Sequence, residues 1–369
     1  MQMNAPYRIE GREYSREALL KRCMEVEQDP SSPPWYRDLF AFIRCFLDEA
    51  AGPVSQLTSG TTGVPKEMTL DREAMTNSAR RTLEFFRLRP GERVLSCLPV
   101  DYIAGKMMAV RALVGGLDLV PAEPSGRPLK GMSGTFSFAA MVPMQLHGSL
   151  NAGDDLSVIR TLLVGGGELH PSLAERVAGV AAGLGGSVPR VFESFGMTET
   201  YTHVALRRIN GTDPDKAFRL MEGVKARQDD RGCLVVEAPG VTFGEVVTND
   251  LVELDAPGRS FRWLGRHDNL ISTGGIKVLP EILEARIGSL IGAECLVLPR
   301  PDEKLGQRLV LVAEWPGEDA PLEEWHILFR QQLALHEIPK QVITVPGLPR
   351  NASFKPDRQA AMKLIFTRD

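Results

Sequence analysis

The segment TSGTTGVPK, residues 58–66, concentrates hydroxyl side chains, glycines and one lysine between two apolar stretches. Glycine lets the main chain approach a ligand closely, while hydroxyls, backbone N–H groups and an ammonium group can surround a polyanion. The segment therefore predicts a phosphate-binding loop, and a solvated Ser/Thr/Gly loop is the alternative that it leaves open when taken alone. The candidate phosphate ligands are Thr58, Ser59, Gly60, Thr61, Thr62, Gly63 and Lys66.

The lysine of this segment does not fit the Walker phosphate loop. That pattern, G-x-x-x-x-G-K-[ST], needs a glycine directly before the lysine and a hydroxyl residue after it. Here Pro65 precedes Lys66, and Glu67 follows it. The sequence therefore argues against a Walker NTPase.

Strand-like and helix-like stretches alternate through most of the chain and would position these residues. Residues 93–100 predict a buried strand and residues 104–116 a helix. Residues 161–169 predict a strand that ends in a glycine turn, followed by a helix over 171–184 that begins with proline. This alternation predicts a large layered α/β domain with a largely parallel sheet.

The pattern changes from about Gly232 onward. Closely spaced β runs without helices predict a small antiparallel β unit or a barrel. After Asp268 we expect a separate small α+β domain, which begins with a glycine hairpin. Its expected elements are a helix over 280–292, strands over 294–300 and 307–315, a helix over 322–335 and a last strand over 340–346. The predicted domains are therefore residues 1–267 and 268–369.

Three further turns could carry chemistry, because ligands of open α/β sheets bind beyond the carboxyl ends of the strands. Three glycines at residues 165–167 would let a flat ligand lie against the backbone. Phe195 offers a stacking face, and Thr198 with Glu199 could hold a phosphate and its magnesium ion. Asp250 could accept hydrogen bonds from two ribose hydroxyls. Taken singly, each turn also fits an ordinary structural role.

Composition argues against several functions. The formal net charge is −4 with both signs mixed along the chain, so nothing indicates binding of nucleic acid. Five cysteines at residues 23, 45, 97, 233 and 295 form no CxxC pair, which is typical of reduced thiols and argues against disulfides and structural zinc. The charged N-terminus and the lack of a run of ~18 apolar residues predict a cytoplasmic protein without stable membrane insertion. The sequence leaves open whether the chain forms homo-oligomers.

The order of the segments resembles the adenylate-forming superfamily of acyl-CoA synthetases and related adenylating enzymes. TSGTTGVPK resembles the phosphate loop of that superfamily, FGMTET its YGxTE segment, TND its TGD segment and LGRHDNLISTGG its GRxDDxIxxGG crossover. Near the C-terminus, LPRNASFKPDR resembles the LPxxxxGKxxR element that carries a catalytic lysine. The matches follow the order of the family from residue 57 to residue 358.

The resemblance implies a reaction and a role for each matched residue. A small-molecule carboxylic acid and ATP would give acyl-AMP and pyrophosphate with Mg²⁺ as cofactor, and CoA would then give the thioester and AMP. Lys355, Glu199 and Thr198 would be catalytic, with Glu199 also the metal ligand. The implied nucleotide-binding residues are those of the phosphate loop together with Gly165, Gly166, Gly167, Ser194, Phe195, Gly196, Met197, Asp250 and Arg266.

The resemblance also implies how the small domain works. Asp268 matches the hinge about which a mobile C-terminal domain turns between the two half-reactions. Gly274 and Gly275 match a loop that lines the CoA tunnel. The chain also departs from the family: its phosphate loop lies near residue 57, which implies a shortened N-terminal part, Glu67 replaces a glycine, and Phe354 replaces the glycine before Lys355.

The acyl pocket is expected around LPVDYIAG, residues 98–105, which resembles LPxxHxxG of the family with Tyr102 in the place of the histidine. Together with GTTGVPKE and GMTETYTHVALR, this segment resembles compact o-succinylbenzoate:CoA ligases of menaquinone biosynthesis. Such a dianion needs a cationic or strongly polar partner for the carboxylate that does not react. Lys106 is our candidate partner, with His203 and Arg207 as weaker ones.

Alternatives to these assignments remain open. Lys106 also fits a surface lysine on an amphipathic helix. A ligase for a different acyl or aryl acid would share all the nucleotide-binding residues. A non-catalytic ATP-binding relative would more readily have lost Lys355 or Glu199, and both are present.

Overall fold

The computed structural model describes residues 6–58, 66–167, 169, 171–183, 189–317, 319–350 and 356–366. The chain divides into two compact units, which are treated separately below. The first comprises Met1–Gly166, Val177–Ala226 and Val236–Val246, and the second comprises Gly167–Arg176, Arg227–Val235 and Val247–Asp369. The domain boundary expected between residues 267 and 268 stays a prediction.

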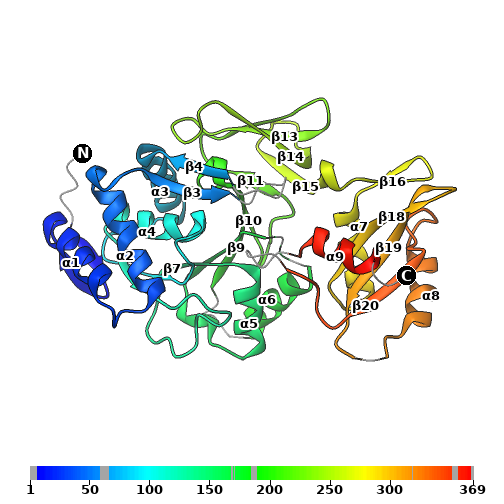
Figure 1. Cartoon of the computed structure of the whole chain (residues 1–369), viewed down its shortest axis with the longest axis horizontal. Coiled ribbons are helices and arrows are strands. Elements are labelled where there is room, and N and C mark those ends of the chain that lie inside the picture. Colours follow the sequence, from blue (N-terminus) through cyan, green and yellow to red (C-terminus); the bar gives the residue numbers. More distant parts are fainter. Residues whose placement is uncertain are drawn as a thin grey trace. The chain divides into compact units, whose positions relative to one another are not determined.

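The first unit is built on a mixed sheet with the strand order β2-β1-β6-β5-β7-β8-β9-β10-β11. Figure 1 labels its strands β7, β9, β10 and β11. The pairs from β1 and β6 through β8 and β9 are parallel, whereas β2, β10 and β11 add antiparallel edges. The predicted, largely parallel sheet is thus confirmed. The strands are β1 (Tyr7–Ile9), β2 (Arg12–Tyr14), β5 (Arg93–Ser96), β6 (Asp118–Pro121), β7 (Phe138–Met141), β8 (Thr161–Val164), β9 (Arg190–Gly196), β10 (His203–Arg208) and β11 (Phe218–Leu220).

The centre of this sheet is buried on both faces. Every residue of β7 and of β8 is buried, as expected for parallel strands between two layers. A separate hairpin, β3 (Val54–Thr58) with β4 (Lys66–Leu70), is antiparallel. The helices are α1 (Arg16–Gln28), α2 (Pro34–Leu47), α3 (Arg72–Phe86), α4 (Ile103–Gly115), α5 (Pro143–Asn151) and α6 (Pro171–Gly183).

Helix boundaries in this part of the chain follow from local capping chemistry. Asp71 caps α3, since its Oδ1 accepts a hydrogen bond from the N–H of Ala74 at 2.7 Å. Helix α4 stops at Gly116, which adopts the left-handed conformation with φ of 59°. Prolines open α2, α5 and α6, where the missing N–H has no partner to lose. The helices predicted over 104–116 and 171–184 are confirmed within one residue at each end.

The second unit contains the predicted antiparallel β segment. Strands β14 (Glu245–Leu254) and β15 (Ser260–Arg266) form a hairpin in which Asp250 lies opposite Arg266. Strands β12 (Lys225–Gln228) and β13 (Cys233–Glu237) precede them in the chain.

The C-terminal part of the second unit is a sheet with helices on both faces. Alternation along β18 produces this arrangement: Cys295 and Val297 pack with residues of α7 and α8, whereas Leu296 and Leu298 pack with Ala361 of α9. Strand β20 runs parallel to β19, and the other pairs are antiparallel, which confirms the α+β prediction. The elements are β16 (Ile271–Thr273), β17 (Ile276–Val278), α7 (Pro280–Ile291), β18 (Cys295–Asp302), β19 (Gly306–Glu314), α8 (Leu322–Gln332), β20 (Gln341–Val345) and α9 (Arg358–Phe366).

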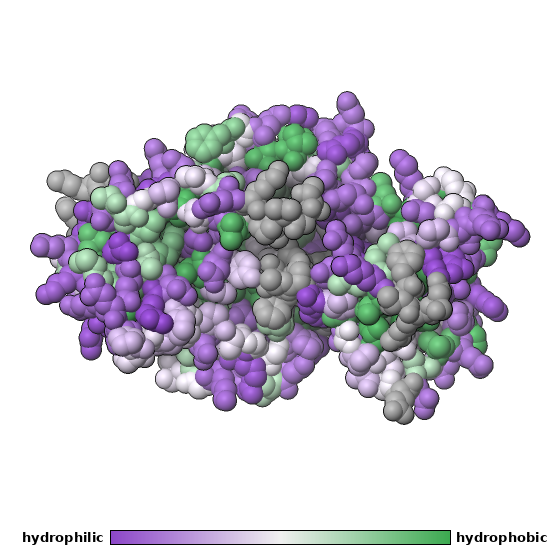
Figure 2. Space-filling view, viewed as in Figure 1, coloured by the Kyte–Doolittle hydropathy of each residue, from purple (hydrophilic) through white to green (hydrophobic). Residues whose placement is uncertain are grey.

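Hydrophilic residues cover most of the surface that Figure 2 shows for each unit. Within the described ranges, no helix has both the length and the apolar character needed to cross a membrane.

Candidate active site

The β3–β4 hairpin carries the predicted phosphate loop. Thr58 and Lys66 are paired directly across the hairpin, so both ends of the loop start from one rigid element. Ser59, Gly60, Thr61, Thr62 and Gly63 lie outside the described residues, as do the side chains of Thr58 and Lys66. Their assignment as phosphate ligands stays a prediction.

The glycine turn after β8 and the end of β9 are adjacent, as predicted for two parallel neighbouring strands. A Cβ atom on Gly165 would lie 2.1 Å from Oγ of Ser194, so a larger residue here would force the Ser194 hydroxyl to move. The Ser194 hydroxyl donates to the carbonyl oxygen of Val164 at 3.2 Å. The structure thus brings two segments that the resemblance assigns to nucleotide binding into direct contact within the first unit.

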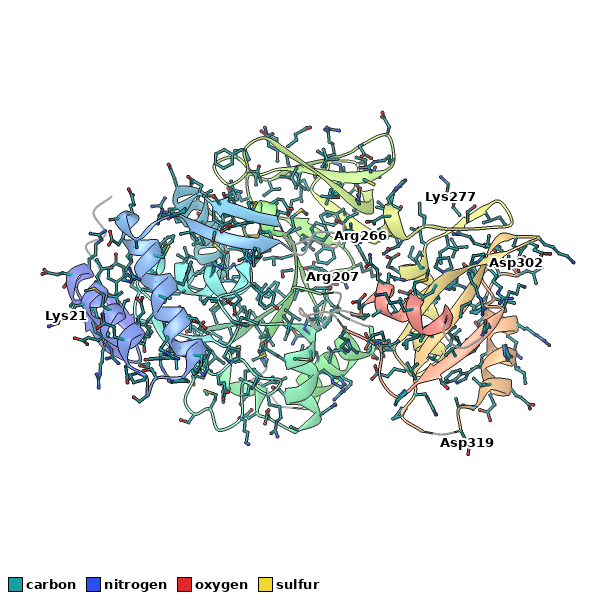
Figure 3. All side chains as sticks on the ribbon, viewed as in Figure 1. Lys21, Arg207, Arg266, Lys277, Asp302 and Asp319 are labelled. Atoms are coloured by element: carbon teal, nitrogen blue, oxygen red, sulfur yellow. The ribbon has the colours of Figure 1, made fainter. Side chains whose placement is uncertain are left out.

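Phe195 is supported from one side by an aromatic and cationic stack. Its ring centroid lies 5.9 Å from that of Phe218, and the guanidinium of Arg207 lies 4.9 Å from the Phe218 centroid. Arg207 (Figure 3) also pairs with the buried Glu193. Arg207 is therefore engaged in supporting Phe195, which argues against its weaker assignment as a substrate cation.

A compact turn over residues 196–202 presents Thr198 and Glu199. Thr200 is fully buried; its hydroxyl accepts from the N–H of Met197 at 3.1 Å and donates to the carbonyl of Thr202 at 2.7 Å. Tyr201 adopts φ of 61°, and its hydroxyl accepts from the N–H of Asp71 at 3.1 Å. This fixed scaffold leaves the Glu199 carboxylate exposed, where a ligand can reach it.

Lys106 is buried within the first unit. Its ammonium group donates to Oε1 of Gln56 at 3.0 Å and to the carbonyl of Val100 at 2.6 Å, and only 9% of the residue is exposed. Burial lowers the pKa of this lysine, an effect that the charge of Asp101 partly offsets. The alternative of a surface lysine is therefore wrong. Tyr102, at the start of α4, is 38% exposed.

Arg111, on α4, is a buried cation that sequence analysis missed. It is 2% exposed, and within the described part of the chain no carboxylate pairs with it and its Nε has no hydrogen-bond partner. Burial lowers its pKa to about 9. The signal in the sequence is an arginine inside the apolar run MMAVRALV, because charged side chains are rarely buried in a core helix unless they are paired.

The hydrogen bonds around Arg111 define the protonation of His203. Nη2 of Arg111 donates to the Thr202 hydroxyl, which lies 3.1 Å from Nδ1 of His203. Nε2 of His203 lies 3.3 Å from the hydroxyl of Thr82. Burial, and then the charge of Arg111, lower the pKa of His203 well below its usual value. A neutral imidazole with the proton on Nε2 satisfies every contact in this chain of donors.

In the second unit, Asp250 is oriented by an indole. The Nε1–H of Trp263 donates to Oδ1 of Asp250 at 2.9 Å, and the N–H of Asp250 donates to the Thr248 hydroxyl at 3.0 Å. Arg266 (Figure 3) forms a bidentate pair with Asp268, with nitrogen–oxygen distances of 3.0 and 2.9 Å. Burial alone would raise the pKa of Asp268, but the hydrogen bond and charge of Arg266 outweigh it and lower that pKa.

The predicted glycine hairpin is present between β16 and β17. Thr273 pairs with Ile276, so Gly274 and Gly275 form a two-residue loop in which both have positive φ, 58° and 81°. Gly274 also donates its N–H to the carbonyl of Leu305 at 2.9 Å. Lys355 lies outside the described residues.

Comparison with known proteins agrees with this geometry. Residues 53–249 match the family model described as AMP-binding enzyme. A crystal structure titled acyl-CoA synthetase (AMP-forming)/AMP-acid ligase II-like protein, from Dyadobacter fermentans, is 32% identical; the match covers 95% of this chain and 99% of that one, with a TM-score of 0.59. The chain belongs to the family of AMP-binding, adenylate-forming enzymes and is an acyl-CoA ligase of that class.

Two further comparisons concern a curated relative and a solved structure. A protein of Salmonella typhimurium named 2-succinylbenzoate--CoA ligase is 27% identical over 329 residues, which cover 84% of this chain and 68% of the relative. ATP-bound MatB from Rhodopseudomonas palustris shares the fold, with 22% identity, a TM-score of 0.74 and coverage of 96% and 82% of the two chains. ATP and CoA are the typical substrates of the family.

Proposed function

We propose that this acyl-CoA ligase is an o-succinylbenzoate:CoA ligase of menaquinone biosynthesis. The acid carries two carboxylates, of which one reacts with ATP. The Salmonella relative is named for the same acid. The observation that carries the proposal is the buried guanidinium of Arg111, which within the described residues has no carboxylate partner.

Arg111 is suited to the carboxylate that does not react. A buried cation without a counterion is costly, and a bound anion removes that cost. Its contact with Thr202 places it beside the turn that carries Thr198 and Glu199, the candidate residues at the reacting end. A guanidinium also binds a carboxylate with two parallel hydrogen bonds, which gives strong discrimination against an acid that lacks the group.

Lys106 remains a second candidate for this role. The two acceptors of its ammonium group, the Gln56 amide and the Val100 carbonyl, are neutral and do not compensate its charge. His203 is neutral in this environment and would contribute a hydrogen bond rather than a charge. We rank Arg111 first because it is more deeply buried and its Nε lacks a partner among the described residues.

In the proposed adenylation, an oxygen of the reacting carboxylate attacks the α-phosphorus of ATP and pyrophosphate leaves. Lys355 would neutralise the charge that develops between the carboxylate and the α-phosphate, where a fixed cation accelerates the reaction most. Asp250 would accept hydrogen bonds from the ribose hydroxyls, with Trp263 holding its carboxylate in one orientation. Gly274 and Gly275 would line the path of CoA in the second half-reaction.

The site is compatible with Mg²⁺. This ion is usually held by one or two carboxylates and by substrate phosphates, and Glu199 supplies an exposed carboxylate on a fixed turn. The part of the chain that the structure describes contains no cluster of three or more His, Cys, Asp or Glu residues suited to a metal. Glu199 would therefore hold the ion together with the phosphates. When bound, Mg²⁺ would neutralise phosphate charge.

The proposal is tested by measuring AMP and thioester formation with CoA, ATP and a panel of acids. The panel contains o-succinylbenzoate, simple benzoic acids and fatty acids. Preference for o-succinylbenzoate supports the proposal. Preference for a benzoic or fatty acid would show an aryl- or acyl-CoA ligase of different specificity. If the protein binds ATP but releases no AMP with any of the acids, a non-catalytic relative is favoured.

A further inference from the structure

Glu281, in the first turn of α7, accepts a hydrogen bond from a residue next to the expected hinge. Nδ2 of Asn269 donates to its Oε1 at 2.5 Å, and only 5% of Glu281 is exposed. Asn269 ends the short helical turn His267–Asn269, directly after Asp268. The buried contact thus joins α7 to the turn that follows β15.

The other carboxylate oxygen of Glu281 faces the end of β15. Oε2 has no hydrogen-bond partner within the described ranges. A Cβ atom on Gly265 would lie 2.4 Å from it, and Gly265 has φ of 135°, so this approach requires glycine. The Glu281 carboxylate of α7 therefore lies against the backbone of β15.

Glu281 also contacts the start of α9. Nη2 of Arg358 lies 3.6 Å from Oε1 of Glu281 and 2.6 Å from Oε2 of Glu284, and Nη1 donates to the carbonyl of Val297 at 3.3 Å. Arg358 is the first residue of α9 and follows Lys355 by three positions in the sequence. One acidic group therefore contacts both the turn after β15 and the helix that follows Lys355.

The side chains of Asn269 and Glu281 are complementary as hydrogen-bond donor and acceptor. The GRxDDxIxxGG pattern has an aspartate where this chain has Asn269. A second carboxylate at that position would meet Glu281 at hydrogen-bond distance in a buried environment, where like charges repel strongly. The amide of Asn269 donates instead, so the two residues form a matched pair.

We propose that Glu281 is a positioning residue for adenylation: through Asn269 and Arg358 it fixes the start of α9 relative to the β14–β15 hairpin that carries Asp250 and Arg266. Glu281 acts through these neighbours and does not touch substrate. The inference rests on the proposed roles of Lys355 and Asp250 and is independent of which acid is used.

The test is a double-mutant cycle on the full chain with Asn269→Asp, Glu281→Gln and both together. We expect Asn269→Asp to slow acyl-AMP formation about tenfold, because it buries two facing carboxylates, while thioester formation from supplied acyl-AMP changes less than about twofold. The double variant should recover to within about threefold of wild type, since the introduced amide can donate to the introduced carboxylate. Asn151→Asp, at an exposed position at the end of α5, is the matched control and should change neither step.

A second readout is independent of turnover. Hydrogen exchange of residues 267–284 should speed up in Asn269→Asp and return toward wild type in the double variant, with melting temperatures recorded for each protein. Equal loss in both half-reactions, or no recovery in the double variant by either readout, would overturn the proposal. If no acid is turned over, the proposed function fails, and the exchange cycle still decides whether Asn269 and Glu281 act as a pair.

Discussion

Arg111 and Thr202 lie 91 positions apart in the sequence and are joined by a hydrogen bond from the guanidinium to the threonine hydroxyl. This bond attaches helix α4 to the turn that carries Thr198 and Glu199. Because Arg111 has no carboxylate partner within the described residues, the contact places an uncompensated positive charge beside the candidate reacting groups. The first two predictions follow from this charge.

Replacing Arg111 by Met should impair use of the dicarboxylate specifically. We expect the kcat/KM for o-succinylbenzoate to fall about a hundredfold, because the carboxylate that does not react loses its cation. The KM for ATP should stay within about threefold. Since a buried charge is replaced by an apolar side chain of similar length, the melting temperature should not fall. Steady-state kinetics and thermal unfolding measure these effects, and an unchanged KM for the acid would rule out this role of Arg111.

Lys106→Met separates the two candidate cations. If Arg111 is the partner of the second carboxylate, Lys106→Met should change the KM for o-succinylbenzoate less than about threefold. Its melting temperature should also change little, because an apolar side chain replaces a cation whose burial already disfavours the charge. The reverse order of effects in the two variants would transfer the assignment to Lys106.

Gly196→Ala should disturb the turn that holds Glu199. An added Cβ would lie 2.3 Å from the carbonyl oxygen of Thr202 and 2.6 Å from Cα of His203, so the backbone must move. We expect kcat to fall at least about tenfold. Gly179→Ala is the matched control: its Cβ meets nothing within 4 Å in helix α6, so it should retain activity and gain about 0.5–1 kcal/mol of stability. Full activity in Gly196→Ala would contradict the described turn.

Trp263→Phe removes the hydrogen bond that orients Asp250. Losing one such bond costs about 1 kcal/mol, so we expect the KM for ATP to rise about fivefold with a smaller change in kcat. Trp35→Phe, on α2, serves as the control and should leave the KM for ATP unchanged. Direct titration with ATP checks that the change is in binding, and equal affinity of the two variants would show that Trp263 does not position a nucleotide ligand.

Stability should depend on pH through Glu284. Burial raises the pKa of this carboxyl to about 7, although the Arg358 charge and the Val297 N–H act in the opposite direction and the charge of Glu281 adds to the rise. Between pH 4.5 and 7 the carboxyl is therefore protonated in the folded state and ionised in the unfolded state. The stabilisation that this proton gives to the folded state is full below pH 4.5 and is lost as the pH rises through 7. Its maximum is about 3 kcal/mol.

Urea unfolding at pH 5 and pH 8 measures this contribution. The wild type should lose more stability than Glu284→Gln as the pH rises, because the amide does not titrate. Using the difference between the two proteins removes the effect of all other titrating groups. A wild type whose stability changes with pH in parallel with Glu284→Gln would contradict the raised pKa.

The element pattern could be predicted from the sequence, because it depends on local periodicity and capping. The apolar run that predicted a helix over 104–116 is α4, and Pro280 and Gly292 bound α7 as local rules require. The order of the motifs also indicated the family. Contacts such as Arg111 with Thr202, Trp263 with Asp250 and Asn269 with Glu281 could not be predicted, because they depend on tertiary packing of distant or paired elements.

The difference between local pattern and tertiary packing also explains why the sequence favours Lys106, and the structure Arg111, as the partner of the second carboxylate. Lys106 lies one helical turn after Tyr102, and this spacing is local information that favours it as a pocket residue. Arg111 lies on the same helix, but its significance depends on complete burial and on the lack of a described acidic partner, which only the folded chain shows.

The most direct measurement is the ratio of kcat/KM for o-succinylbenzoate to that for benzoate, with ATP and CoA and with the thioester identified by mass. We expect a ratio above about a hundred in the wild type, from the interaction of a buried cation with the second carboxylate, and a ratio near one in Arg111→Met. A wild-type ratio near or below one, or no thioester from o-succinylbenzoate, would contradict the proposed function.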